Sequence, residues 1–288
     1  MVPVLLGLVA ALCWSVHDLV ARSFAGQVGP LRMALFVLLA GAGLLAPIVI
    51  SQGTIWHADG GSLLTSCLFG VAYALALGGL LKAFSLAPVS VVGPLTAGYP
   101  ALVVVWGILH GLSPSLVQWL AIAAVLMGAV IVGRFGANDG GLSVVPPGKI
   151  WVVLVSALVA VLGFAASIVL GQDAAKTIGE IETTFISRFP AALLVLAAVR
   201  VLEPAQALTG PRGMWKAVGA MALCDVIAVC SINAATHFPN KELGAMAISA
   251  YGALSVLFAM VFLKEKVSAA QWLGILMITG GVAVLAAP

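Results

Sequence analysis

The stretch AAQWLGILMITGGVAVLA, residues 269–286, is an apolar segment with a Gln-Trp pair near its start, at Gln271. A second apolar segment, LVQWLAIAAVLMGAVIV at residues 116–132, carries the same pair at Gln118. In both segments a glycine follows the glutamine by ten residues. Each segment falls in the range of about 17–25 residues that a helix needs to cross a bilayer. A repeated segment of membrane length predicts a duplicated membrane protein.

The composition supports an integral membrane protein and excludes several other classes. Apolar residues make up 62% of the 288 residues and charged residues only 8%, whereas a soluble domain carries about 25% charged residues. A net charge of +3 gives no indication of nucleic-acid binding. The chain lacks a Gly-rich phosphate loop, a His-Glu-x-x-His site and a Gly-x-Ser-x-Gly elbow, so ATP-driven transport, metal binding and hydrolysis are not expected. The four cysteines lie in apolar runs without metal-ligand spacing and are interpreted as buried small residues.

Ten apolar stretches are expected to cross the membrane as helices. They are residues 2–20, 30–50, 62–81, 88–109, 116–132, 150–170, 185–201, 215–235, 243–263 and 269–286. The first stretch has no basic residues before it and no clear cleavage site, so it is interpreted as a retained span. The longest polar connector divides the chain into a first repeat at 1–137, a connecting loop at 138–149 and a second repeat at 150–288.

Further matches extend the repeat beyond the two Gln-Trp segments. Tyr99-Pro-Ala-Leu matches Tyr251-Gly-Ala-Leu, and Arg32 matches Arg188. Because each half has five spans, an odd number, the second half must enter the bilayer from the opposite side. The fold class predicted is therefore an all-α membrane protein of ten transmembrane helices in two inverted five-helix repeats. This architecture is typical of secondary transporters with a midplane site, although a duplicated scaffold without transport is the alternative.

Loop charge predicts the orientation. Ten Lys and Arg residues fall on the side reached after the odd-numbered spans, and three fall on the side of the termini. The three are Lys176, Arg188 and Lys241. The excess of positive charge places the odd-numbered loops in the cytoplasm and both termini outside.

Acidic residues inside the apolar stretches are candidate functional residues, because a charge in the bilayer is costly. Asp18 follows Trp14 by four residues, so the two share a helix face near His17. Asp18 could bind a substrate ammonium or carry a proton, with Trp14 as an aromatic wall, or could reach the headgroups from the span end. Asp225 lies mid-span, and we expect it to face the bundle interior and find a partner there. It is either an acid that lines a cavity or a buried acid hydrogen-bonded to a broken helix. Asn233 lies eight residues further on, about a quarter turn around the same helix.

Lys82 ends the third span, and the repeat aligns it with Asn233. Two polar residues at symmetric positions suggest a site on the pseudo-two-fold axis, in which Lys82 would bind a substrate carboxylate. The alternative is a lysine that extends to the cytoplasmic edge of the membrane.

A pair of tyrosines at matching positions is the last candidate. Thr96 and Tyr99 share a face of the fourth span, and Tyr251 and Ser255 share one in the ninth. The two tyrosines could clamp a planar ligand from both sides. The alternative is close helix packing, because the ninth span is rich in small residues.

Four short motifs stand out by their order and spacing: ALCWS at 11–15, LKEK at 263–266, QWLG at 271–274 and GGV at 280–282. On these residues the sequence resembles two tandem EamA-like domains of the drug/metabolite transporter superfamily, over nearly its whole length. The first half departs from the pattern, because Leu112 stands where the second half has Glu265. Within the superfamily the Tyr- and Trp-bearing helices are most similar to the YddG-like aromatic amino-acid exporters.

The resemblance and the repeat together lead to a functional expectation. We expect a secondary transporter that exports small polar metabolites, above all amino acids, across the bacterial inner membrane by alternating access. A multidrug or nucleotide-sugar transporter is the first alternative, and a lipid-modifying enzyme or scaffold is the second. Short loops argue against an enzyme, and no cofactor is expected. The expected partners are a small-molecule substrate and the lipid bilayer; the oligomeric state is left open.

Overall fold

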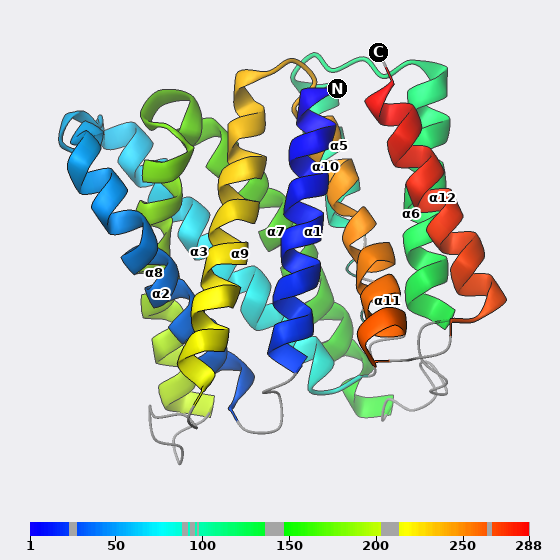
Figure 1. Cartoon of the computed structure of the whole chain (residues 1–288), viewed down its shortest axis with the longest axis horizontal. Coiled ribbons are helices and arrows are strands. Elements are labelled where there is room, and N and C mark those ends of the chain that lie inside the picture. The colour runs from blue at the N-terminus through cyan, green and yellow to red at the C-terminus, as the bar shows by residue number, and fades with distance from the viewer. Residues whose placement is uncertain are drawn as a thin grey trace.

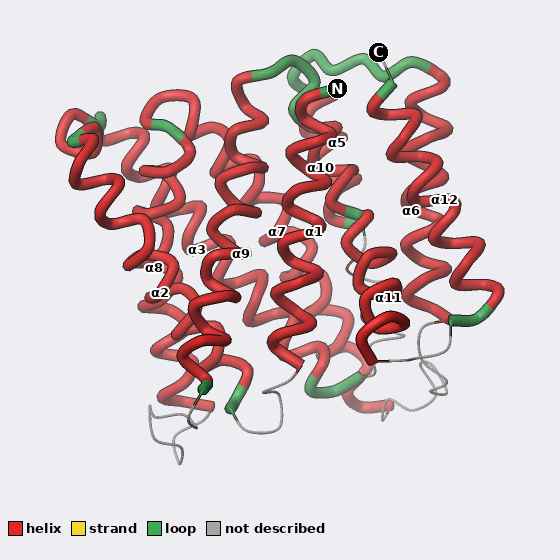
Figure 2. Tube along the Cα trace, in the orientation of Figure 1, coloured by secondary structure: helices red, strands yellow, loops and turns green. Residues whose placement is uncertain are grey.

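The computed structural model describes residues 1–22, 28–87, 92, 96, 98–135, 147–202, 213–263 and 267–287, and in these residues it contains helices and no strand (Figure 2). In the first half the helices are α1 (Val2–Arg22), α2 (Pro30–Gln52), α3 (Gly60–Phe84), α5 (Tyr99–Leu109) and α6 (Leu116–Phe135). In the second half they are α7 (Ile150–Ile178), α8 (Glu180–Leu202), α9 (Met214–Ala234), α10 (Glu242–Ile248), α11 (Ala250–Leu263) and α12 (Ala269–Ala286). Short 3-10 turns lie at Thr54–His57, Pro147–Lys149 and Ala235–His237. The all-helical prediction is confirmed for the described residues.

Eight of the described helical segments are long and apolar enough to cross a membrane. Two shorter apolar helices, Tyr99–Leu109 and Leu116–Val132, lie where the fourth and fifth spans are expected. Part of the expected span 88–109 lies outside the described residues, so the count of ten remains a prediction.

Two expected spans have different bounds in the structure. Helix α7 continues eight residues beyond the expected end at 170, because Gln172 is buried and hydrogen-bonded rather than exposed to solvent. The helix ends before Gly179, whose φ of +88° is in the left-handed region that favours glycine. Helix α8 accordingly begins at Glu180, five residues before the expected start. The expected ninth span is two helices, α10 and α11, separated by Ser249.

The helices pack with the symmetry of a duplicated chain. Helix α1 runs away from the face that carries both termini, and α7 runs toward that face (Figure 1). The first helix of each half packs against the third helix of the other, as α1 on α9 and α7 on α3, while α2 packs on α8 and α6 on α12. Opposite directions and exchanged partners are the arrangement expected of two inverted repeats.

The repeated Gln-Trp pair has a structural explanation at the start of α6 and of α12. The side chain of Gln271 accepts a hydrogen bond from the Ser268 amide while the Gln271 amide donates to the Ser268 hydroxyl, at 2.8 and 3.2 Å. Ser115 and Gln118 make the same reciprocal pair, at 2.9 and 3.3 Å. Such a capping box satisfies two free backbone amides at a helix start. The glutamine therefore recurs because it fixes where each last helix begins.

Glycines let the same two helices approach closely. A Cβ on Gly128 would lie 2.7 Å from the carbonyl oxygen of Gly274, and a Cβ on Gly274 would lie 2.8 Å from that of Gly128. The contact is therefore reciprocal between the two repeats. Inside a membrane the hydrophobic effect does not drive helices together, and van der Waals packing does so instead. Small residues strengthen this packing because they let the two backbones touch.

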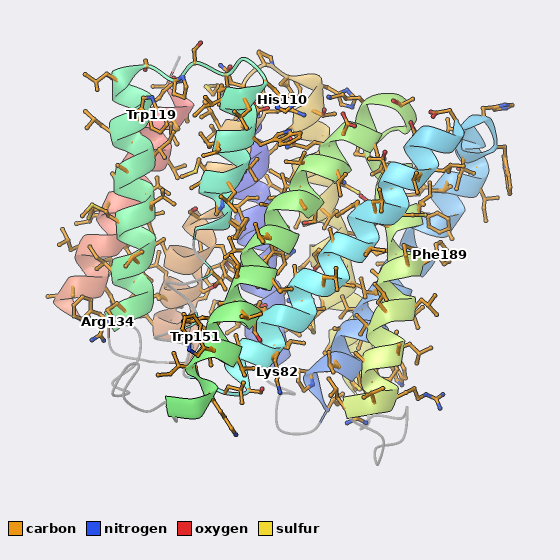
Figure 3. The ribbon with its side chains drawn as sticks, turned by 180° about the vertical axis from the view of Figure 1, so that it is seen from behind. Lys82, His110, Trp119, Arg134, Trp151 and Phe189 are labelled. Atoms are coloured by element: carbon orange, nitrogen blue, oxygen red, sulfur yellow. The ribbon has the colours of Figure 1, made fainter. Side chains whose placement is uncertain are left out.

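Six of the seven tryptophans are exposed and lie near the helix ends. On the face of the termini they are Trp56, Trp106 and Trp119, and on the opposite face Trp151, Trp215 and Trp272. Figure 3 shows Trp119 and Trp151 at opposite edges of the bundle. Tryptophan is enriched at both membrane–water interfaces, so these two sets mark where the two membrane surfaces meet the protein.

Reporter fusions are expected to show that both termini are periplasmic. Arg188 and Arg32 must be removed from the loop count, because they lie buried within α8 and α2. This leaves Lys176 and Lys241 against nine basic residues on the other side. Alkaline phosphatase fused after residue 287 should be active and a fluorescent protein there should be dark. The same reporters inserted in the 138–149 connector should give the opposite pattern. A bright fluorescent fusion at the C-terminus would reverse the orientation.

Candidate functional site

The site is built around two buried charges on neighbouring helices. Asp225 lies in the middle of α9 and is 3% exposed, and Arg188 lies within α8 and is 2% exposed. The Arg188 Nη2 atom is 2.8 Å from Asp225 Oδ2. Removing charges from water costs several kcal/mol each, so such a pair is stable only with close contact and further hydrogen bonds.

Two aromatic side chains from the first half supply the further contacts. The indole N–H of Trp14 on α1 donates to Asp225 Oδ1 at 3.2 Å, and the Tyr73 hydroxyl on α3 donates to the same oxygen at 3.3 Å. The Arg188 guanidinium carbon lies 5.9 Å from the centre of the Tyr73 ring, within cation–π distance. We call Trp14, Tyr73, Arg188 and Asp225 the central cluster. It joins two helices of each repeat near the middle of the bundle.

The repeat symmetry places another aromatic group beside the central cluster. Phe164 on α7 follows Leu158-Val-Ala at the same offset at which Trp14 follows Leu8-Val-Ala, so it is the counterpart of Trp14 in the sequence repeat. Its ring centre lies 6.2 Å from that of Tyr73 and 5.6 Å from that of Tyr99. Tyr99 therefore reaches the central cluster through Phe164 and Tyr73. The site consists of two opposite charges with aromatic faces around them.

Asp18 belongs to a separate group between α1 and α11. Its Oδ1 lies 3.0 Å from His17 Nδ1, and its Oδ2 accepts a hydrogen bond from the Tyr251 hydroxyl. The Ser15 hydroxyl donates to the Tyr251 carbonyl at 3.2 Å and lies 3.5 Å from the Ser255 hydroxyl. The side chain of Asp18 is 42% exposed, so this carboxylate, unlike Asp225, is open to its surroundings.

Asn233 lies in a third group at the end of α9, on the face of the termini. It is buried and donates to the Thr184 hydroxyl at 3.3 Å. A Cβ on Gly171 would lie 2.5 Å from Asn233 Oδ1, so α7 and α9 meet closely at this point. The side-chain amide nitrogen of the nearby Gln172 donates a hydrogen bond to the Ile232 carbonyl oxygen, at 3.0 Å. This group links α7, α8 and α9.

The structure does not bring Lys82 and Asn233 together. Lys82 is exposed in the last turn of α3, at the edge of the bundle opposite the termini (Figure 3). Asn233 lies near the other edge, because an axis in the membrane plane carries equivalent residues to opposite faces. The Thr96 hydroxyl donates to the Val92 carbonyl one turn back, at 2.9 Å.

Arg188 is the residue that sequence reasoning assigned wrongly. The loop count treats it as a loop charge near the start of a span, yet α8 begins at Glu180, five residues before the expected start, and carries Arg188 into the bundle. The signal was present, because an arginine inside an apolar stretch marks a functional position by default. Tyr73 carried only the weak signal of a tyrosine within an apolar run.

Comparison with known proteins agrees with the two-repeat architecture. The EamA-like transporter family matches residues 1–134 and 150–287. The chain belongs to this family. The EamA family is a transporter family of the drug/metabolite transporter superfamily, so the resemblance expected from the sequence is confirmed. This EamA protein is also similar to a solved structure titled "Crystal structure of protein", with a TM-score of 0.81 and 21% identity over 99% of this chain and 96% of that one. That likeness shows the fold alone, and no curated protein matches the chain.

The two tyrosines are expected to respond differently to removal of their hydroxyls. Tyr251→Phe removes the hydrogen bond to Asp18, whereas Tyr99→Phe keeps the ring that packs on Phe164. A hydrogen bond to a charged group contributes about 1.5–3 kcal/mol to stability, so Tyr251→Phe should lower the free energy of unfolding by up to about that amount while Tyr99→Phe stays near wild type. Thermal unfolding in detergent measures the difference. Equal losses in the two variants would contradict distinct roles for the hydroxyls.

Proposed function

We propose that this EamA protein is a secondary transporter that exports small polar metabolites, in the first place amino acids, across the bacterial inner membrane by alternating access. The observation that carries the proposal is the buried Arg188–Asp225 pair, in contact with Trp14 and Tyr73. Charged residues within membrane spans mark substrate or ion pathways, and no covalent chemistry is needed for this role.

The pair matches the two charges of an amino acid. A guanidinium is a planar donor suited to a carboxylate, and a carboxylate accepts hydrogen bonds from an ammonium group. A zwitterion that enters the central cluster can replace the contact between Arg188 and Asp225 with two contacts of its own. Two features favour such an exchange. The Nε atom of Arg188 is buried without a hydrogen-bond partner, so it can donate to a substrate carboxylate. The neighbouring α2 has a glycine, Gly41, at this point, and a Cβ added there would lie 3.8 Å from the Nε atom, so the missing side chain leaves space beside the guanidinium.

The aromatic neighbours favour an amino acid with a planar side chain. Trp14, Tyr73, Tyr99 and Phe164 lie around the pair. Aromatic pairs contribute about 0.5–1.5 kcal/mol beyond the area that they bury. This supports placement in the aromatic, YddG-like branch as part of the proposal.

The position of the cluster fits alternating access. Trp14 and Tyr73 come from the first repeat, and Arg188 and Asp225 from the second. A substrate bound here contacts both halves and can therefore favour one arrangement of the halves over another, as any ligand must to shift a conformational equilibrium. Inverted halves that exchange roles would carry the site from one membrane face to the other.

Transport by the purified protein in proteoliposomes tests the proposal. Labelled amino acids, a labelled nucleotide sugar and a cationic dye are offered in parallel, with unlabelled substrate trapped inside. We expect exchange of amino acids, strongest for L-phenylalanine, L-tyrosine or L-tryptophan, and its loss in Asp225→Asn. Arg134→Gln, at an exposed helix end, is the matched control for removal of a charge. Exchange of only the nucleotide sugar or the dye would contradict the amino-acid assignment.

A further inference from the structure

We propose that Asp18 is the proton-binding carboxylate that couples this transporter to a proton gradient, at a site separate from the central cluster. The inference rests on the proposed transport function. It assigns different tasks to Asp225 and Asp18: Asp225 holds Arg188 and contacts the substrate, whereas Asp18 binds and releases a proton.

The first argument is the charge of the partners. Asp225 lies 2.8 Å from an arginine, a group that keeps its proton in proteins. The described partners of Asp18 are His17 and Tyr251, a side chain that titrates near neutral pH and a neutral hydroxyl. Neither of these described partners carries a fixed positive charge.

The second argument is access. The side chain of Asp18 is 42% exposed, against 4% for Asp225. A coupling group must exchange its proton with water on each side in turn, which a sealed carboxylate cannot do. Asp18 lies one turn from the end of α1, toward the face opposite the termini, and His17 beside it can pass a proton on.

The third argument distinguishes a proton from a metal cation. Both oxygens of Asp18 already face donors, His17 Nδ1 on Oδ1 and the Tyr251 hydroxyl on Oδ2. A sodium or calcium ion requires several oxygen ligands with free lone pairs. In the described residues no group of three His, Cys, Asp or Glu side chains could hold a metal ion.

Among the described residues, Asp18 contacts His17 on α1 and Tyr251 on α11. Trp14, one turn away on α1, links it to the charge of Asp225 on α9. Helix α12 has no titratable side chain, and in α10 and the 235–237 turn the titratable residues are Glu242, which packs over Gly107, and His237, which pairs with Glu180.

Helix α1 provides the connection between proton and substrate. Trp14 and Asp18 are one turn apart on α1, and Trp14 donates to Asp225 in the central cluster. A proton that binds Asp18 removes the negative charge that holds the Tyr251 hydroxyl of α11. The balance between the α1–α11 contact and the α1–α9 contact then changes. Proton binding at Asp18 therefore changes the position of α1, the helix that also contacts the substrate site through Trp14. Coupling requires that binding at one site change the free energy of binding at the other, and the shared helix supplies this link.

The test separates exchange from accumulation. Proteoliposomes carry wild type, Asp18→Asn, Asp18→Glu or Asp59→Asn, and the probe is labelled L-phenylalanine. Exchange is measured at equal pH on both sides, and accumulation is measured with a pH gradient. Asp59 caps α3 outside the spans by accepting a hydrogen bond from the Ser62 amide. Hydrogen bonds from the Ser62 side chain and from its amide lower the pKa of the Asp59 carboxyl. Asparagine can form the same cap, so Asp59→Asn is a matched control.

We expect Asp18→Asn to keep exchange within about twofold of wild type and to lose at least ~10-fold of the gradient-driven accumulation. Asp18→Glu should recover part of the accumulation, and Asp59→Asn should behave as wild type. Accumulation by Asp18→Asn at the wild-type level overturns the inference and leaves the transport function standing. Loss of exchange as well as accumulation also overturns it, because Asp18 would then bind substrate. A wild type that exchanges phenylalanine but ignores the pH gradient excludes proton coupling.

Discussion

Arg188→Leu is expected to lower the free energy of unfolding by about 3–5 kcal/mol, because it leaves the Asp225 carboxylate buried without its counter-charge. The arginine is 2% exposed and lies 2.8 Å from that carboxylate, so water cannot easily replace it. The hydrogen bonds from Trp14 and Tyr73 stay but cannot neutralise the charge. Thermal unfolding in detergent, followed by tryptophan fluorescence, measures the loss.

The double variant Arg188→Leu/Asp225→Leu separates folding from function. Replacement of both charges by apolar groups removes the unpaired carboxylate, so the double variant should be more stable than either single one. Transport should remain absent in all three, because both charges are proposed to contact the substrate. Equal stability of Arg188→Leu and wild type would show that the pair does not contribute to folding. Transport by the double variant would exclude the pair from the substrate site.

Gly7→Leu is expected to separate α1 from α10 and to reduce both stability and transport. A Cβ on Gly7 would lie 2.1 Å from the carbonyl oxygen of Gly244 and 2.9 Å from the Ala247 Cβ, so the obstacle is largely backbone and cannot rotate away. Added atoms in a packed region cost about 1–3 kcal/mol, and more where backbone must move. Because α1 also carries Trp14, its displacement should disturb the hydrogen bond to Asp225.

Gly43 in α2 provides the matched control for this contact. A Cβ added there would meet no atom within 4 Å. Gly43→Ala should therefore be neutral or more stable by up to about 1 kcal/mol, through helix propensity alone. Gly244→Ala, whose Cβ would lie 2.7 Å from the Pro3 carbonyl oxygen, should reproduce the defect from the other side. A wild-type melting temperature and transport rate in Gly7→Leu would mean that the helices do not need this approach.

The helix starts were partly readable from the sequence. The Ser-x-x-Gln pattern before α6 and α12 is a local signal, because its hydrogen bonds join residues three apart. The end of α7 was misjudged for the opposite reason: Gln172 looks like the end of a span, yet its side chain bonds to the Ile232 carbonyl of α9, 60 residues away. A polar residue that finds a distant partner gives no local sign of burial.

The sequence by itself determined the membrane environment, the duplication and the family, because apolar length, repeat spacing and motifs are properties of the chain in order. It also identified Asp225 as an acid in need of a partner. Only the tertiary structure decided that the partner is Arg188 and that Trp14, 211 residues away in the chain, donates to the same carboxylate. It also showed that Asn233 and Lys82 lie at opposite edges of the bundle and that the Tyr251 hydroxyl donates a hydrogen bond to Asp18. The physical reason is that such contacts depend on how helices of the two repeats lie against each other, which no spacing along a single helix records.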